Sequence, residues 1–423
     1  MKVMVIGRGG REHSLIQTLA KSEGVSKLYA APGNAGVEAE RVAIPETDQE
    51  KLVAFAKENA VDLTIVGPEN PLLEGLVDRF EEAGLRVFGP SKAAALIEGS
   101  KHFAKKLMAD YDIPTAAYEA FTEVEPAKAY IREKGAPIVV KADGLAAGKG
   151  VVVAQTLDEA LDAAEEMLVN GQFGEASREI VVEEFLQGEE FSLMAFVNGR
   201  DVYPMITARD HKRAFEGDRG PNTGGMGAFA PVPNLEPGAY EFAVESILQP
   251  TADAMVSEGR PFVGILYAGL IETNEGPKVI EFNARFGDPE TQVVLPLLEN
   301  NLEQVFVDVL EGRNPKLRWK DATCAGVVVA SKGYPGAYEK GRPVPVLDSG
   351  ATFTVHAGTE VSEDGYVSNG GRVLLVGSEA ANLPVALENV YDHLQQFDGN
   401  KDFFYRRDIG LSSVTASMSH HRK

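Results

Sequence analysis

Short apolar runs alternate with amphipathic stretches through the first hundred residues, and this alternation limits the fold more than any other feature. Strands that alternate with helices form βαβ units, whose strands lie parallel in one sheet. We therefore expect a Rossmann-like parallel sheet in residues 1–100. The expected strands are residues 3–6, 27–30, 63–66 and 86–88, and the expected helices are residues 11–21, 48–59 and 71–83.

The rest of the chain mixes β-rich runs with helices and predicts further α+β units. A length of 423 residues corresponds to roughly three domains. We place a central domain at residues 101–314, with a subdomain at about 119–190, and a small α+β domain at residues 320–423. Residues 209–233 lack periodicity, which predicts a long loop that is either functional or disordered. Helices are expected at residues 101–110, 157–168 and 291–299, and the polar tail at 412–423 is expected to fray.

The charge balance excludes several classes of ligand. Lys and Arg number 41 against 63 Asp and Glu, a net charge of −22 that would repel nucleic acid and anionic membranes. The single cysteine, Cys324, allows neither an intrachain disulfide nor a cysteine zinc site. No apolar run reaches the roughly 18 residues of a membrane span, and no signal peptide is evident. We expect a cytoplasmic monomer that binds small molecules, with no nucleic-acid or membrane partner.

A glycine-rich turn, residues 7–13, follows the first expected strand directly. Such a turn exposes backbone N–H groups and a helix N-terminus to an anion. It is not a dinucleotide-binding fingerprint, because Glu12 stands where the third glycine would be. Two interpretations stay open, a tight turn of the sheet or a phosphate site at Gly9 and Gly10 with help from Arg8 or Arg11.

A second glycine-rich run, residues 141–150, lies between β-rich runs. The spacing from Gly144 to Gly148 is one residue too short for a P-loop, and Gly150 replaces the required Ser or Thr. The pattern predicts a strand–loop–strand flap whose lysines, Lys141 and Lys149, cover phosphates and exclude water. A plain hairpin is the alternative.

Residues 181–190 predict a strand that ends in carboxylates and an apolar pair. Backbone groups at Glu183, Glu184, Phe185 and Leu186 could line an adenine slot, and Glu190 could accept hydrogen bonds from a ribose. A solvated acidic turn explains the same residues equally well.

Residues 278–290 predict a strand on which polar side chains share one face. Glu281, Asn283 and Arg285 alternate with apolar residues. A carboxylate beside an amide oxygen suits Mg²⁺ that bridges phosphates, and Arg285 would add a cation. Ordinary solvated alternation is the other interpretation.

In this order, a lysine, a glycine flap, a Glu-Glu-apolar hinge and a Glu-x-Asn strand resemble the ATP-grasp superfamily. Within it, the chain is similar to the phosphoribosylamine–glycine ligase family. The resemblance implies a central ATP-grasp domain with a mobile flap subdomain. It also implies ligation of glycine to 5-phosphoribosylamine through glycyl phosphate, with ATP as co-substrate and Mg²⁺ or Mn²⁺ as metal, in purine biosynthesis. The motifs that carry it are residues 7–13, 141–150, 210–213, 220–227 and 285–290.

The resemblance also implies roles for individual residues. Two positions depart from the family pattern: Arg209, where glutamine is expected, and Glu272, where an apolar residue is expected and which could supplement the metal site. The implied nucleotide-binding residues are Lys105 (with Lys101 as its rival), Lys141, Glu183, Glu184, Phe185, Leu186, Glu190, Arg213 and Asn222. The implied metal ligands are Glu281 and Asn283, the implied catalytic residues Arg285 and Asp288, and the implied substrate-binding residues Arg8, Gly9 and Gly10.

Three other functions compete with this interpretation. Another ATP-grasp ligase or carboxylase would share the motifs and differ in substrate. A nicotinamide-dependent dehydrogenase would use the N-terminal sheet, but the fingerprint there is incomplete. A nucleotide-sensing module would bind ATP without glycine-dependent turnover.

Overall fold

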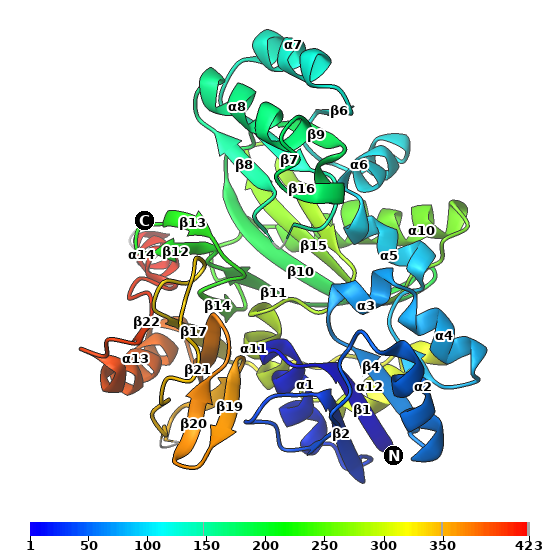
Figure 1. The fold of residues 1–423 in the computed structure, drawn as a ribbon, viewed down its shortest axis with the longest axis vertical. Helices are drawn as coiled ribbons and strands as arrows, with labels where there is room; N and C mark the ends of the chain where they lie inside the picture. The colour runs from blue at the N-terminus through cyan, green and yellow to red at the C-terminus, as the bar shows by residue number, and fades with distance from the viewer. Residues whose placement is uncertain (147, 348–349, 421–423) are drawn as a thin grey trace.

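The N-terminal part of the chain folds as a parallel sheet flanked by helices (Figure 1). The computed structural model describes residues 1–146, 148–347 and 350–420. The strand order is β3-β2-β1-β4-β5, which confirms the expected Rossmann-like sheet. Its strands are β1 Lys2–Gly7, β2 Lys27–Pro32, β3 Glu40–Arg41, β4 Leu63–Val66 and β5 Val87–Phe88. Its helices are α1 Gly10–Ala20, α2 Gln49–Glu58, α3 Glu69–Leu73, α4 Leu76–Glu82 and α5 Lys92–Gly99.

The helix expected at residues 71–83 is wrong as a single element. Gly75, with a φ of +87°, ends α3 and begins α4. Only glycine adopts this left-handed conformation without steric cost, and the periodicity of the flanking apolar residues hides the break.

A small lobe forms the top of the molecule in Figure 1. It holds a four-stranded antiparallel sheet of order β6-β9-β7-β8. Two helices pack on it around a separate apolar core that includes Ile131, Val140 and Met167. The β7–β8 pair confirms the strand–loop–strand arrangement around the glycine run, of which Ala147 lies outside the described residues. The elements are β6 Tyr118–Phe121, α7 Val124–Lys134, β7 Ile138–Ala142, β8 Val151–Ala154, α8 Leu157–Leu168, η1 Gly174–Ser177 and β9 Ile180–Glu184.

The largest sheet has nine strands and runs through the centre of the molecule into its C-terminal part. Its order is β16-β15-β10-β11-β14-β17-β21-β18, and β22 pairs with β17. The junction is the antiparallel ladder from Gly227–Ala230 to Cys324–Val327. The strands are β10 Glu189–Asn198, β11 Asp201–Asp210, β14 Gly227–Ala230, β15 Val263–Thr273, β16 Gly276–Asn283, β17 Thr323–Ser331, β18 Phe353–His356, β21 Arg372–Ala380 and β22 Phe403–Phe404.

The loop expected at residues 209–233 is partly wrong, because it contains regular structure. β12 (Arg213–Phe215) and β13 (Arg219–Asn222) form a two-stranded hairpin, and β14 enters the large sheet. β14 is buried on both faces, so its glycine and alanine residues show no alternation.

The remaining elements surround the large sheet. The helix expected at 291–299 is shorter, because it ends at Val294 and tightens into one 3₁₀ turn, and the expected frayed tail is helical as far as His420. The remaining elements are α6 Lys101–Asp110, α9 Ala239–Ala243, η2 Val244–Leu248, α10 Gln249–Ser257, α11 Glu290–Val294, η3 Leu295–Leu297, α12 Leu302–Leu310, β19 Thr359–Ser362, β20 Gly365–Ser368, α13 Leu383–Leu394, η4 Gln395–Phe397 and α14 Leu411–His420.

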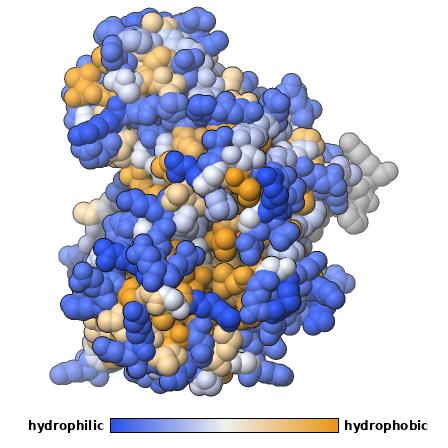
Figure 2. All heavy atoms as spheres, turned by 90° about the vertical axis from the view of Figure 1, so that its right-hand side faces the viewer, coloured by the Kyte–Doolittle hydropathy of each residue, from blue (hydrophilic) through white to orange (hydrophobic). Residues whose placement is uncertain are grey.

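The surface is strongly polar, as the composition requires. Figure 2 shows one face, on which hydrophilic residues cover most of the area and apolar residues show in patches. None of the helices in the described ranges combines the length and apolar character needed to cross a bilayer.

Candidate active site

One cavity of about 1300 Å³ gathers nearly all the residues that the sequence singled out. Its walls come from the N-terminal part, the small lobe, the large sheet and the C-terminal part. Arg8, Gly9 and Gly10 are not among its lining residues. The predicted residues that line it are Lys105, Lys141, Glu183, Glu184, Phe185, Leu186, Glu190, Arg213, Asn222, Glu281, Asn283, Arg285 and Asp288.

The glycine turn after β1 is occupied by the chain's own carboxylate. Gly9 N–H donates to Glu12 Oε2 at 2.8 Å, and Arg11 Nε donates to Glu12 Oε1 at 2.7 Å. Arg8 points to the surface, where its guanidinium pairs with Glu46 at 2.9 Å. The geometry accounts for a tight turn, and the phosphate site at this turn stays a prediction.

Glu183 lies beneath two lysines and is only 4% exposed. Its Oε2 atom is 3.0 Å from Lys141 Nζ and 3.3 Å from Lys105 Nζ. Burial lowers the pKa of Lys105 to about 8, although Glu183 acts in the opposite direction. The side chain of Glu183 therefore holds two cations in place, a role that its position in the predicted hinge did not indicate.

The two candidate lysines of α6 face different partners. Lys105 Nζ donates to Thr115 Oγ1 at 2.6 Å and stays beside Glu183. Lys101 Nζ instead donates to the carbonyl of Gly144, in the glycine run, at 3.0 Å. Both side chains line the cavity, and Lys105 is the one that shares a carboxylate with Lys141.

The segment between β9 and β10 passes close to β15. A Cβ atom on Gly188 would lie 1.9 Å from the carbonyl oxygen of Glu272, so only glycine fits. Arg209 contacts the start of β10, where its Nε donates to the carbonyl of Glu190 at 2.7 Å, while Lys212 Nζ pairs with the Glu190 carboxylate at 3.0 Å. Glu272 pairs with Glu189 across the β10–β15 ladder, so both departures from the family pattern lie next to the hinge.

Glu281 and Asn283 project from the end of β16, as the alternation predicted. Burial acts to raise the pKa of Glu281. Lys212, Lys141 and other nearby cations together lower it by more than burial raises it, so the pKa lies below its ordinary value. An ionised carboxylate beside an amide oxygen fits the preference of Mg²⁺ or Mn²⁺ for oxygen ligands.

Arg285 is placed differently from the expectation. β16 ends at Asn283, so Arg285 lies beyond the strand and not on its face. Its guanidinium is 3.0 Å from Glu98 and 3.3 Å from Glu69. Burial acts to lower its pKa, and these two carboxylates raise it above its ordinary value. Both carboxylates come from the N-terminal part, and no motif in the sequence had indicated either.

Asp288 lies where three parts of the chain meet. Arg372 of β21 is 3.1 Å from Asp288 Oδ1, and the backbone N–H of Arg11 donates to Oδ2 at 3.3 Å. Gln292 Nε2 donates to Oδ1 at 2.8 Å. Burial acts to raise its pKa, but Arg372 and Arg11 lower it, which keeps the carboxylate ionised. Asp288 therefore ties the C-terminal part to the N-terminal turn.

A second group of carboxyls, Asp210 and Glu290, was not predicted as a unit. Tyr267 Oη lies 3.0 Å from Glu290 Oε1 and 2.8 Å from Ser192 Oγ. Glu290 Oε2 is buried and makes no hydrogen bond to the described residues. Burial and the nearby Asp210 raise the pKa of Glu290 to about 7. Such a group can accept hydrogen bonds from an ammonium ion.

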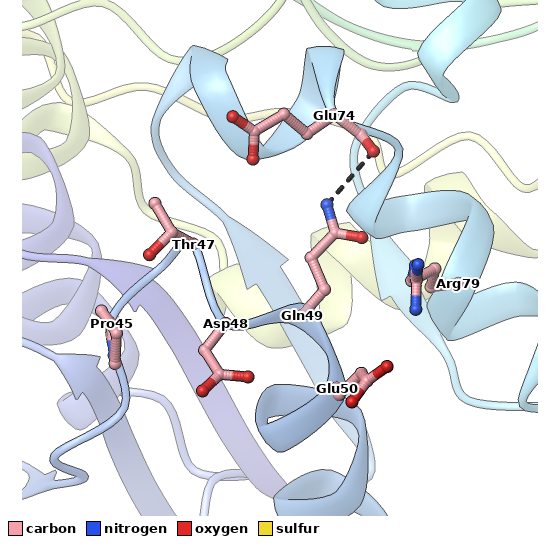
Figure 3. Close-up of a pocket in the computed structure, with 7 residues that line it drawn as sticks. All are labelled: Pro45, Thr47, Asp48, Gln49, Glu50, Glu74 and Arg79. Atoms are coloured by element: carbon pink, nitrogen blue, oxygen red, sulfur yellow. Dashed lines mark hydrogen bonds between the residues drawn. The ribbon is translucent and has the colours of Figure 1, made fainter.

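A smaller hollow of about 550 Å³ lies in the N-terminal part (Figure 3). It shares no lining residue with the large cavity. Its charged side chains are Asp48, Glu50, Glu74 and Arg79, an acidic set that would not attract a phosphate.

The ATP-grasp class is defined by three features that this structure combines. They are a hairpin with a glycine run, two lysines that share one carboxylate, and a Glu-x-Asn strand within an antiparallel sheet. The chain belongs to the phosphoribosylglycinamide synthetase family. The family models match residues 1–98 (N domain), 99–291 (ATP-grasp domain) and 324–412 (C domain).

Curated relatives and solved structures agree with this family. Phosphoribosylamine–glycine ligases of Halalkalibacterium halodurans and Listeria innocua are 56% and 55% identical, each over 98% of this chain and over 97% and 100% of their own. The crystal structure of phosphoribosylamine–glycine ligase from Thermotoga maritima superposes with a TM-score of 0.85 at 32% identity, covering 96% of this chain and 100% of that one. A biotin carboxylase domain of Hydrogenobacter thermophilus shares the fold alone, with a TM-score of 0.72 at 17% identity over 96% of this chain and 91% of that one.

Proposed function

We propose that the chain ligates glycine to 5-phosphoribosylamine, giving glycinamide ribonucleotide, ADP and phosphate, as the names of its relatives indicate. The observation that carries the proposal is the joint presence, in one cavity, of paired lysines and the Glu281–Asn283 pair. This combination of cations and metal-binding oxygens serves phosphoryl transfer, which depends on positioning and charge neutralisation.

The chemistry proceeds in two transfers. A carboxylate is a poor electrophile, so a glycine oxygen first takes the γ-phosphoryl group of ATP, and the bond to ADP breaks. The amine of phosphoribosylamine then attacks the acyl carbon, inorganic phosphate leaves with that glycine oxygen, and the amine loses a proton. No protein nucleophile is needed, and cations around the transferring group stabilise the transition state.

The residues divide into three working groups. The adenosine lies along residues 184–190, and the phosphates reach Lys105, Lys141 and Arg213. Glu281 and Asn283 hold Mg²⁺ or Mn²⁺, which when bound would neutralise phosphate charge. Arg285 and Asp288 lie at the reacting end, and we place the glycine ammonium group against Asp210 and Glu290. Buried carboxyls next to a site for polyanions support this placement, because they suit a cationic group.

An ADP-release assay with each substrate omitted in turn tests the proposal. We expect ADP only when ATP, glycine and phosphoribosylamine are all present. Glycine labelled with ¹⁸O in its carboxylate should deliver one label to inorganic phosphate per turnover, and unlabelled phosphate would exclude glycyl phosphate. ADP release that instead requires bicarbonate and phosphoribosyl-aminoimidazole would assign the chain to a carboxylase.

We also propose that the protein works as a monomer in the cytoplasm. All groups named above come from one chain, which supports a monomer as the working unit. Light scattering during size-exclusion chromatography should give a mass near 45.4 kDa. Twice that mass would contradict it.

A further inference from the structure

A buried arginine of the C-terminal part, Arg406, grips the β12–β13 hairpin. Arg406 is only 2% exposed although it carries a full charge. Its Nη1 atom donates to the carbonyl of Arg213 at 3.0 Å and lies 3.0 Å from Asp218 Oδ1, in the turn of the hairpin. Its Nε and Nη2 atoms donate to both oxygens of Asp408, at 2.8 and 2.9 Å. One guanidinium therefore joins the first strand and the turn of the hairpin to the C-terminal part.

Neighbouring groups extend this contact along the whole turn. Asp408 Oδ2 accepts from the backbone N–H of Gly217 at 2.8 Å, and Glu216 Oε1 accepts from the N–H of Arg407 at 3.3 Å. At the base of the hairpin, His211 Nε2 accepts from the N–H of Gly410 at 3.3 Å. We call this set of contacts, centred on Arg406, the C-terminal latch.

Beyond its base, where Gly224 N–H donates to Tyr334 Oη at 3.1 Å and Arg372 Nη1 donates to the Gly224 carbonyl at 3.0 Å, the hairpin makes few other contacts with the described residues. Its two strands are short, and their register shifts between Arg213 and Phe215. Phe215 packs against Phe404 with ring centroids 6.0 Å apart and is still 50% exposed. Polar contacts are directional and short in range, so they hold an exposed hairpin in one position better than this apolar contact can.

The hairpin carries two side chains that face the nucleotide cavity. Arg213 and Asn222 are paired across its strands and both line the cavity, and so does Asp218. Removing the guanidinium of Arg406 would leave Asp218 and Asp408 close together without a cation between them. The loss of the bond from Arg406 to the Arg213 carbonyl, together with a repulsion that solvent weakens because the Asp218 side chain is 72% exposed, would displace Arg213 and Asn222.

We propose that Arg406 is a positioning residue that sets the affinity for ATP by holding the β12–β13 hairpin at the cavity. The inference rests on the proposed function, which places the nucleotide against Arg213 and Asn222. Arg406 itself touches no substrate, since its guanidinium is enclosed by Arg213, Asp218 and Asp408.

The test compares Arg406→Met with Arg407→Met in the full-length protein. Arg407 is the matched control, because its side chain is 58% exposed and pairs with Asp398, outside the hairpin, while its backbone N–H, which donates to Glu216, is kept in the variant. For Arg406→Met we expect the KM for ATP to rise about tenfold, with kcat and the KM for glycine changed less than twofold. Calorimetry with a non-hydrolysable ATP analogue should give the same tenfold loss, which corresponds to about 1.4 kcal/mol. Arg407→Met should match the wild type.

Other outcomes overturn the proposal. A KM for ATP within twofold of wild type in Arg406→Met would show that the latch does not serve the nucleotide. Equal losses in every kinetic constant together with a lower Tm would indicate a merely structural role. If Arg406→Met does not fold, Asp218→Asn decides: we expect a two- to threefold higher KM for ATP, and no change overturns the proposal. Binding of the analogue is measured without turnover, so a wrong assignment of substrates would leave this result intact.

Discussion

Two hairpins border the same cavity, and they are held in opposite ways. β7–β8 belongs to the small lobe, where it packs with helices α7 and α8 around a separate apolar core. β12–β13 is a two-stranded ribbon whose position depends on the C-terminal latch. A lobe with an apolar core of its own can shift as a body once the few polar contacts between Asp143 or Gly144 and α6 break, whereas a ribbon without such a core depends on its polar contacts for its position. We therefore predict that the β7–β8 wall of the cavity closes over the nucleotide and that the β12–β13 wall stays in place.

The first prediction concerns the cavity that both hairpins border. Glu281→Gln removes the charge of the proposed metal ligand at the cavity, and we expect kcat to fall by about 10²–10³, the size of loss seen when one group that stabilises transition-state charge is removed. Glu272→Gln is the matched control, because Glu272 is not among the residues that line the cavity. The amide oxygen of the glutamine in this variant can still accept from Glu236 N–H. Activity measured at saturating Mg²⁺ tests both variants. Near-normal turnover of Glu281→Gln would contradict the assignment of the metal site to β16.

The second prediction separates the two walls by pH. The wall beside the small lobe contains Lys105, whose pKa is lowered to about 8 by burial, while the opposite wall contains Arg213. As pH rises from 7 to 9.5, Lys105 loses its proton, and we expect the affinity for an ATP analogue to fall about tenfold. Lys105→Arg should bind with an affinity that does not change over this range. A flat profile for the wild type would mean that Lys105 does not contact the phosphates.

The third prediction compares the mobility of the hairpins by limited trypsin digestion. Lys149 lies in the β7–β8 connection and Arg219 in β13, and both are exposed. We expect ATP to slow cleavage after Lys149 several-fold, because the lobe closes over the nucleotide, and to leave cleavage after Arg219 unchanged. Mass spectrometry of the fragments distinguishes the two sites. If ATP protects both sites equally, or protects neither site, the predicted difference between a closing wall and a fixed wall is wrong.

The smallest expected effect is on the free energy of unfolding in mild acid. Burial, with a further contribution from Arg406, lowers the pKa of His211 from 6.5 to about 4. The unfolded chain therefore takes up the proton first, and stability that is present above pH 6.5 is lost as pH falls toward 4. Between pH 6.5 and 5.5 this amounts to about 1 kcal/mol, which His211→Gln should abolish while keeping an acceptor for Gly410. Urea unfolding of both proteins at the two pH values measures it, and identical differences would contradict it.

The sequence predicted those parts of the site in which neighbouring residues act together. Glu281 and Asn283 share a strand face because alternate residues of a strand do so, and no other information was needed. The glycine run was likewise assigned to a strand–loop–strand hairpin from its flanking β-rich runs. The N-terminal sheet followed from a pattern that repeats over short distances.

The parts that could not be predicted depend on contacts between distant segments. Glu98 and Glu69 meet Arg285 only because the N-terminal part packs on β16, and their own surroundings in the sequence are unremarkable. Glu183 resembled a hinge residue until the fold placed Lys105 and Lys141 on it. β14 was hidden for the same reason, since its partner strand β17 follows about a hundred residues later.

The ladder between β14 and β17 has a consequence for anyone who wishes to cut the chain. Family models separate an ATP-grasp domain ending at residue 291 from a C domain beginning at 324, but the hydrogen bonds of one sheet cross that boundary. A fragment truncated between the two would present β14 as an unpaired edge strand, the kind of surface on which chains aggregate. The C-terminal part is therefore no detachable module: grafting it onto another enzyme, or expressing the protein without it, means breaking a sheet in its interior.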